Sequence, residues 1–210
     1  MTTQMALTME ELVGLAPVVP VVVIDDLDDA VPLAAALVRG GLPAIEVTLR
    51  TQPALAAIER IAAEVPGAYV GAGTVTTAQQ VDDALSAGAR FLVSPGATPT
   101  LLDAMQASGV PFLAGTATPS DVIALLERGI TYAKFFPAEI NGGVKALKAF
   151  AGPFPQLRFC PTGGIKAANA PDYLKQPNVA CVGGSWMVSG DFEQVETLAA
   201  EAAGLLIPMK

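Results

Sequence analysis

The sequence predicts an α/β protein with the (β/α)8 fold of a TIM barrel, preceded by a short N-terminal helix. Eight short apolar segments alternate with eight helical segments, and this alternation is typical of a parallel sheet. Eight such units are enough to close the sheet into a barrel. Residues that carry chemistry follow almost every predicted strand, whereas the alternative, an open doubly wound sheet, gathers them at one crevice. We expect a single domain over residues 1–210 with short loops.

A capping box marks the start of the leading helix, because Thr8 precedes Glu11 by three residues. This helix is expected over residues 8–15. The β-branched run that follows, residues 17–24, predicts a buried first strand. An acidic pair then opens a helix over residues 28–38, which a glycine pair ends.

The remaining units repeat this order of apolar run, turn and helix. The helix expected over residues 53–65 carries a proline, Pro53, in its first turn, which is a favourable position for that residue. We expect the other strands over residues 44–50, 68–74, 91–96, 110–116, 130–138, 156–164 and 178–185, and the other helices over residues 53–65, 78–87, 98–108, 118–129, 143–151, 168–173 and 193–205.

Composition excludes several classes of function. The net charge is −8 without any cluster of basic residues, so nucleic-acid binding is not expected. No apolar run approaches the length that crosses a bilayer, and residues 1–12 do not resemble a signal peptide, so we expect a cytoplasmic protein without a membrane partner. Cys160 and Cys181 lie in predicted strands, which suits inert thiols in a reducing compartment. The 52% of hydrophobic residues predicts a subunit interface or a core buried on both faces.

Histidine is missing from the sequence. This excludes Ser-His-Asp and Cys-His catalysis, and every zinc site that contains histidine. Acid–base chemistry must therefore fall to Glu, Asp, Lys, Tyr or water.

A single lysine, Lys134, lies within the apolar and aromatic run 131–136, which Pro137 ends. Burial disfavours the charged form of a lysine, so a free amine near neutral pH is expected there. Such an amine can attack a carbonyl group and form a Schiff base. The simpler interpretation of this residue alone is an amine that reaches past the strand end into water.

Glu46, Thr48 and Arg50 share one parity on the second predicted strand, and we expect that parity to point into the barrel. Opposite charges on one buried face are unusual. One interpretation is an internal salt bridge of Glu46 with Arg50 or Lys134. In the functional interpretation, Glu46 exchanges protons and Arg50 binds a substrate carboxylate.

Three turns carry weaker signals. The run 71–74 lacks the third glycine of a dinucleotide-binding fingerprint, so its glycines are expected to let Thr74 and the backbone approach a ligand, or simply to form a tight turn. The turns at 94–96 and 115–116 follow the fourth and fifth strands, where an ordinary turn explains each equally well.

Two glycine pairs follow the seventh and eighth strands, in Thr162-Gly163-Gly164 and Gly183-Gly184-Ser185. Glycine-rich turns expose backbone N–H groups that can bind a phosphate. Phosphate sites of (β/α)8 barrels recur in these two loops. Backbone donors need no basic cluster, which fits the acidic composition, and a pair of structural turns is the alternative.

Eight motifs occur in order along the chain: EVTLR (46–50), VGAGTV (70–75), SPG (94–96), KFFPAE (134–139), GGVKAL (142–147), GPF (152–154), RFCPTGGI (158–165) and CVGGSW (181–186). Together they resemble the bacterial 2-keto-3-deoxy-6-phosphogluconate aldolases, which are also described as 4-hydroxy-2-oxoglutarate aldolases. The resemblance runs from about Pro17 to Trp186. The sequence departs from the family pattern at residues 115–120, which puts substrate breadth in question, and after Trp186, which puts subunit packing in question.

The resemblance implies a class I aldolase, a lyase of carbohydrate metabolism and the Entner–Doudoroff pathway. It implies a homotrimer that needs no metal or other cofactor. The substrates it implies are 2-keto-3-deoxy-6-phosphogluconate, cleaved to pyruvate and glyceraldehyde 3-phosphate, and 4-hydroxy-2-oxoglutarate, cleaved to pyruvate and glyoxylate. Lys134 would form the Schiff base, Glu46 would carry the proton, and Arg50 would contact the pyruvyl carboxylate.

The resemblance also implies a substrate pocket. Its further residues would be Thr74, Pro95, Phe136 and Thr162, with Gly163, Gly164, Gly184 and Ser185 around the phosphate. A phosphosugar epimerase or isomerase on the same barrel, and a phosphate-binding scaffold without catalysis, remain as alternatives. Borohydride reduction in the presence of pyruvate separates the three, because only the aldolase gains a stable adduct on a lysine.

Overall fold

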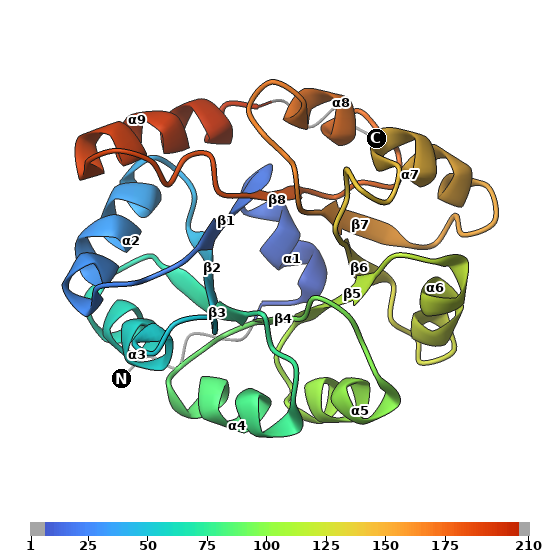
Figure 1. The fold of residues 1–210 in the computed structure, drawn as a ribbon, viewed down its shortest axis with the longest axis horizontal. Helices are drawn as coiled ribbons and strands as arrows, with labels where there is room; N and C mark the ends of the chain where they lie inside the picture. The colour runs from blue at the N-terminus through green and yellow to red at the C-terminus, as the bar shows by residue number, and fades with distance from the viewer. Residues whose placement is uncertain (1–6, 206–210) are drawn as a thin grey trace.

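The computed structural model describes residues 7–205 and confirms the predicted barrel (Figure 1). Eight parallel strands pair in the order β7-β6-β5-β4-β3-β2-β1-β8. Two isolated parallel bridges, Phe159 with Val179 and Thr162 with Gly183, join the ends of this sheet and close the ring. The strands are β1 (Val18–Val22), β2 (Ala44–Thr48), β3 (Tyr69–Gly73), β4 (Leu92–Val93), β5 (Phe112–Thr116), β6 (Tyr132–Phe135), β7 (Arg158–Pro161) and β8 (Val182–Gly184).

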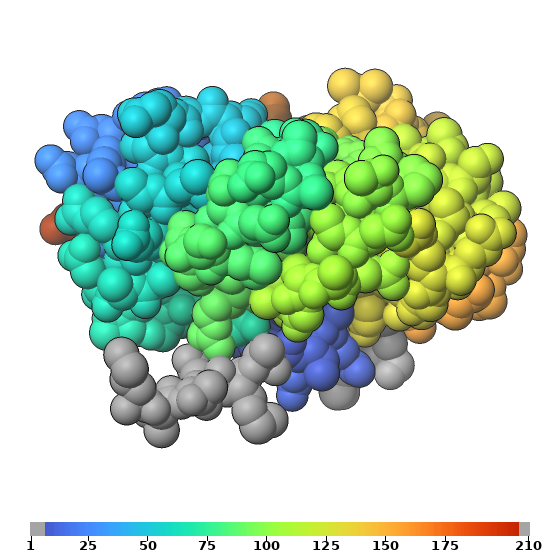
Figure 2. Space-filling model, turned by 90° about the horizontal axis from the view of Figure 1, so that it is seen from below, coloured from blue at the N-terminus to red at the C-terminus, as the bar shows by residue number. Residues whose placement is uncertain are grey.

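Helices α2 to α9 surround the ring of strands (Figure 1). Figure 2 shows α3 to α6 side by side as a continuous outer layer. Within the described part of the chain, no helix is long and apolar enough to cross a membrane. The helices are α1 (Met9–Gly14), η1 (Leu27–Asp29), α2 (Ala30–Arg39), α3 (Ala54–Glu64), α4 (Ala78–Ser86), α5 (Pro99–Ala107), α6 (Pro119–Leu126), α7 (Gly143–Ala151), α8 (Ala170–Leu174) and α9 (Phe192–Ala203).

The short helix α1 covers one end of the barrel. Its capping box forms as predicted, with the Thr8 hydroxyl accepting from the Glu11 N–H and the Glu11 carboxylate accepting from the Thr8 N–H. In Figure 2 this helix, in blue, lies at one end of the ring of helices. Leu12 and Val13 of α1 pack on the interior layer formed by Val19, Ala44, Tyr69, Phe91, Val93, Leu113, Cys160 and Cys181. Because α1 and these side chains fill that end, polar groups inside the barrel face the opposite one.

The predicted strands are longer than the observed ones. Strand β2 ends at Thr48, so Arg50 lies beyond it. Strand β4 keeps only two residues, Leu92 and Val93, because the chain turns at the Ser94–Pro95 pair that follows. Pro53 is the N-cap of α3 and not part of its first turn. Each of these differences lies at the end of an element, and the order of elements is as predicted.

Candidate active site

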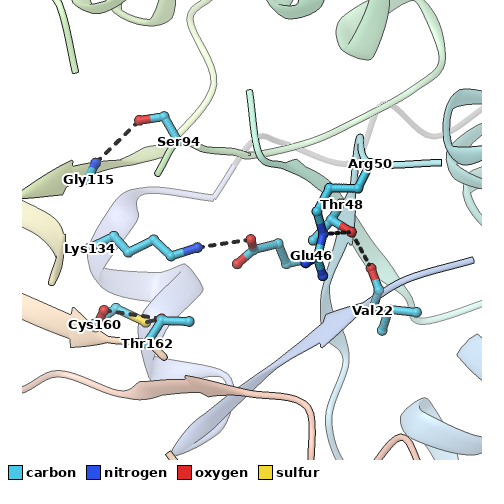
Figure 3. A network of polar contacts seen from close by, with 9 residues as sticks. All are labelled: Val22, Glu46, Thr48, Arg50, Ser94, Gly115, Lys134, Cys160 and Thr162. Carbon is cyan, nitrogen blue, oxygen red and sulfur yellow. Dashed lines mark hydrogen bonds and ion pairs between the residues drawn. The ribbon is translucent and has the colours of Figure 1, made fainter. Parts of the chain in front are cut away.

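Lys134 of β6 and Glu46 of β2 face each other across the inside of the barrel (Figure 3). The distance from Lys134 Nζ to Glu46 Oε1 is 3.2 Å, and the two residues are only 5% and 3% exposed. The interpretation in which Lys134 reaches into water is therefore wrong. The structure contains one of the two internal ion pairs that the sequence suggested, the pair of Glu46 with Lys134.

Glycine makes room for the carboxylate. A methyl group on Gly73 would lie 2.2 Å from Glu46 Oε1, which is inside van der Waals contact. The next residue, Thr74, is half-buried and has a φ of 60°, a conformation that a β-branched residue rarely adopts. Such strained residues cluster at functional sites, so the end of β3 is built around Glu46.

Arg50 lies outside the strand and does not contact Glu46, so the predicted alternative of a Glu46–Arg50 salt bridge is wrong. Its side chain is exposed, and its Nε donates to Thr48 Oγ1 at 3.2 Å. The Thr48 hydroxyl, which is buried, donates in turn to the carbonyl of Val22 at 3.0 Å (Figure 3). The guanidinium group is thus held near the carboxyl end of β2, where it can meet an anion that enters from solvent.

Phe136 and Pro95 lie close to the lysine. The Phe136 ring centroid is 5.2 Å from Lys134 Nζ, within the range of a cation–π contact. Gly115 pairs with Lys134 in register, and a methyl group on Gly115 would lie 2.3 Å from the Pro95 carbonyl oxygen. The turn after β4 therefore approaches the strand next to Lys134.

Residues 115–120, where the sequence was expected to depart from the family pattern, support the lysine strand from outside the ion pair. The Thr116 hydroxyl donates to the Lys134 carbonyl at 3.0 Å. The Asp121 carboxylate accepts from the Ala117 and Thr118 N–H groups and closes the capping box of α6. This segment contacts the backbone of Lys134 and not its amine.

The glycine turns after β7 and β8 are neighbours. Thr162, which is buried, pairs with Gly183, and a methyl group on Gly183 would lie 2.3 Å from Thr162 Oγ1. Gly163 and Gly164 follow with φ values of 98° and 80°, where other residues are strained. On the second turn, Gly184 is buried and a methyl group there would lie 2.1 Å from the Trp186 ring, while Ser185 is exposed. The predicted phosphate-binding residues are thus together at one end of the barrel.

A comparison with protein families matches residues 9–202 to the model described as "Aldolase: KDPG and KHG aldolase". The chain belongs to the KDPG and KHG aldolase family. It is 51% identical to the KHG/KDPG aldolase of Escherichia coli K12 over 92% of this chain and 93% of that protein. This membership makes the chain an aldolase and confirms the resemblance drawn from its motifs.

Solved structures of this aldolase family share the fold at full length. A 2-keto-3-deoxy-6-phosphogluconate aldolase from Zymomonas mobilis superposes with a TM-score of 0.94 at 49% identity, over 96% of this chain and 99% of that one. A KDPG aldolase from Legionella pneumophila, solved with pyruvate captured as a covalent carbinolamine, gives a TM-score of 0.92 at 44% identity, over 94% and 99% of the two chains.

Several residues that shape the site of this aldolase were not singled out by sequence reasoning. Thr48 was noted only for its parity, and Gly73 and Gly183 only as parts of glycine turns. Each acts through a neighbour that is distant in sequence or on another strand, so local periodicity carries no signal for it. Among residues 7–205, no group of three or more His, Cys, Asp or Glu side chains is arranged to hold a metal ion.

Proposed function

We propose that Lys134 forms the Schiff base of a class I aldolase that cleaves 2-keto-3-deoxy-6-phosphogluconate, and also 4-hydroxy-2-oxoglutarate. The observation that carries the proposal is the buried amine of Lys134 within 3.2 Å of the Glu46 carboxylate. An amine must lose its proton before it attacks a carbonyl, and a carboxylate within hydrogen-bond distance can accept that proton. The covalent pyruvate carbinolamine of the Legionella pneumophila relative supports this chemistry.

The reaction begins when the Lys134 amine attacks the C2 ketone of the substrate. The Glu46 carboxyl group returns the lysine proton to the C2 hydroxyl, which leaves as water and gives an iminium ion, and Glu46 is a carboxylate again. The iminium ion accepts the electron pair of the C3–C4 bond when that bond breaks. Glu46, through a water molecule, removes the proton of the C4 hydroxyl, and the aldehyde product leaves. The resulting enamine takes a proton at C3 from the same carboxyl group, and hydrolysis then releases pyruvate and the free lysine.

The other predicted residues are proposed to bind the substrate. Arg50, held by Thr48 at the end of β2, would form charge-assisted hydrogen bonds with the pyruvyl carboxylate. Thr74, Pro95, Phe136 and Thr162 would line the pyruvyl half of the pocket. The turns with Gly163, Gly164, Gly184 and Ser185 would bind the phosphate through backbone donors, which suits a chain of net charge −8.

Borohydride reduction in the presence of pyruvate tests the proposal. The protein should gain one pyruvyl group, and peptide mapping should find it on Lys134. A matched variant, Lys145→Arg on the exposed face of α7, should be labelled like the wild type. No adduct on the wild-type protein, or an adduct on another lysine, would contradict the assignment and favour an epimerase, an isomerase or a binding protein.

We further propose that this aldolase acts as a homotrimer in the cytoplasm. The support for a subunit interface is the 52% of hydrophobic residues, and Ile140 in the turn after β6, which is 83% exposed, is a candidate interface residue. Light scattering on the purified protein should give three times the chain mass, and Ile140→Glu should lower it. A monomeric wild-type protein would contradict the trimer.

A further inference from the structure

Two consecutive carbonyl groups in the turn after β7 are held by donors from other segments. The Gly163 carbonyl accepts from the N–H of Glu139 at 3.1 Å. The Gly164 carbonyl accepts from Nδ2 of Asn169, also at 3.1 Å. A hydrogen bond to a carbonyl fixes the orientation of its whole peptide unit, because the peptide is planar.

The orientation of these two peptides decides where their N–H groups point. In a trans peptide the N–H points opposite to the C=O. The N–H groups of Gly164 and Ile165 therefore point away from Glu139 and Asn169. Neither N–H donates to an acceptor among the described residues. The strand on the other side of β7 is β8, whose turn carries Gly184 and Ser185, so these two N–H groups are free to take part in the proposed phosphate site.

Asn169 spans the turn with one side chain. Its Oδ1 accepts from the Lys166 N–H at 2.7 Å, while its Nδ2 donates to the Gly164 carbonyl. The residue is half-buried and is the N-cap of α8, although its side chain makes no cap hydrogen bond. Both polar atoms of its amide group thus bond to the backbone of the turn after β7.

Tyr173 and Glu139 support the same turn from the α8 side. The hydroxyl of Tyr173, which is 1% exposed, donates to Glu139 Oε1. A methyl group on Gly164 would lie 2.5 Å from Glu139 Cγ, so the turn packs directly on that side chain. Burial, and then the Glu139 carboxylate, raise the pKa of Tyr173, so the hydroxyl stays protonated and keeps donating at neutral pH.

We infer that Asn169 is a positioning residue that orients the phosphate-binding N–H groups and so sets the preference for phosphorylated substrates, with the Tyr173–Glu139 pair as its support. This inference rests on the proposed aldolase function and deepens it. Asn169 itself touches the turn and not the substrate. Its loss should weaken phosphate binding without changing the chemistry at Lys134.

Steady-state kinetics with two substrates tests the inference. For Asn169→Ala, the KM for 2-keto-3-deoxy-6-phosphogluconate should rise about 2- to 13-fold, the usual worth of one hydrogen bond. The kinetics with 4-hydroxy-2-oxoglutarate, which has no phosphate, should change less than about twofold. Tyr173→Phe should also raise the KM for 2-keto-3-deoxy-6-phosphogluconate relative to that for 4-hydroxy-2-oxoglutarate, by a smaller factor than Asn169→Ala. This ratio of the two KM values measures the preference for the phosphorylated substrate. An unchanged ratio, or equal losses on both substrates, would overturn the inference.

Two further variants separate the loss of the Asn169 hydrogen bond from the effect of an added charge and from the effect of misfolding. Asn169→Asp keeps the acceptor for the Lys166 N–H but cannot donate to the Gly164 carbonyl. It should therefore lose the preference for the phosphorylated substrate, as Asn169→Ala does. Ala168→Asp adds the same charge on the neighbouring exposed residue and should keep the wild-type ratio. If Asn169→Ala does not fold, Asn169→Asp carries the test against Ala168→Asp.

The proposed function and this inference fail in different ways. If the wild-type protein traps pyruvate on Lys134 but Asn169→Ala keeps the wild-type substrate ratio, only the inference fails. If the wild-type protein traps no pyruvate, the proposed function fails, and the inference that rests on it fails as well. Pyruvate trapping by Asn169→Ala at the wild-type level, together with the lost preference, supports both.

Discussion

Lys134 Nζ and Glu46 Oε1 lie 3.2 Å apart inside the barrel although the two residues are 88 positions apart in the sequence. Closure of the ring brings β6 and β2 to face each other, and no local pattern could measure that distance. Since both groups are almost wholly buried, each can contribute to stability as an ion pair and to catalysis as a proton-transfer pair. Substitution of each of the two residues separates these contributions.

Lys134→Arg should abolish retro-aldol turnover, because a guanidinium group stays protonated and cannot become a nucleophile. The ion pair with Glu46 can persist, so circular dichroism should show a folded protein. Lys148→Arg, on the outer helix α7, serves as the matched control and should keep its activity. Turnover by Lys134→Arg above that of a mock preparation would contradict the Schiff-base role.

Glu46→Gln should lower turnover by about 10²- to 10⁴-fold, the usual worth of a positioned acid–base group. Glutamine has nearly the same shape but cannot carry a proton, and some pyruvate trapping on Lys134 should survive. A thermal melt on the same sample provides the control. A sharp fall in Tm, with activity that follows the folded fraction, would mean that Glu46 acts as a structural ion pair, whose loss typically costs about 3–5 kcal/mol.

Asp121→Asn should destabilise the protein in a pH-dependent way. Burial acts to raise the pKa of Asp121, but hydrogen bonds from the Ala117 and Thr118 N–H groups and the Thr118 hydroxyl outweigh it, and the pKa lies below its ordinary value. A lowered folded-state pKa contributes stability above the unfolded value of about 3.9, and this contribution is lost as the pH falls through the folded value.

For Asp121→Asn the Tm should therefore lie below that of the wild type at pH 7, by the equivalent of about 0.3–1 kcal/mol. The gap should begin to narrow as the pH falls below about 4 and close as it falls through the lowered pKa of folded Asp121. Melts from pH 7 to pH 3 test this, and a gap that stays constant over that range would show that the charge of Asp121 contributes nothing.

The order and type of the elements could be predicted from the sequence because each depends on local patterns. The helix expected over residues 143–151 is observed as Gly143–Ala151, and the capping box at Thr8 forms as expected. Strand ends were predicted less well, since pairing partners come from distant segments. Strand β2 ends at Thr48 and not at residue 50, which moves Arg50 from the interior to the mouth of the barrel.

The candidate site could likewise be predicted only in part. The motifs identified the lysine, the glutamate and the glycine turns, because their residue types are unusual where they occur. The neighbours that hold them in place could not be found by motif or periodicity. Gly73 is one example. Only the folded structure shows that a side chain at this position would collide with Glu46.

Gly73→Ala should lower turnover about 10²-fold, the effect of a misplacement of about 1 Å in a catalytic group. The added methyl group would lie 2.2 Å from Glu46 Oε1, so the carboxylate must move away from Lys134. Gly152→Ala is a suitable control, because its φ is −67° and nothing lies within 4 Å of the new methyl group. Equal activities of the two variants would show that the position of the Glu46 carboxylate is not limiting.

Thr48→Val should weaken binding of the substrate carboxylate while leaving the Schiff-base chemistry intact. Valine has nearly the shape of threonine but cannot accept from Arg50 Nε or donate to the Val22 carbonyl, so the guanidinium group loses its anchor. The pyruvate concentration needed for half-maximal borohydride trapping should rise about 2- to 13-fold, as for one lost hydrogen bond. Thr51→Val is the matched control, because Thr51 also donates to a carbonyl at the end of β1, that of Ile24, without binding Arg50. Both proteins should still label Lys134 fully at saturating pyruvate. If the two variants need the same pyruvate concentration, or if Thr48→Val raises it no more than its loss of folded protein explains, then Thr48 does not position Arg50.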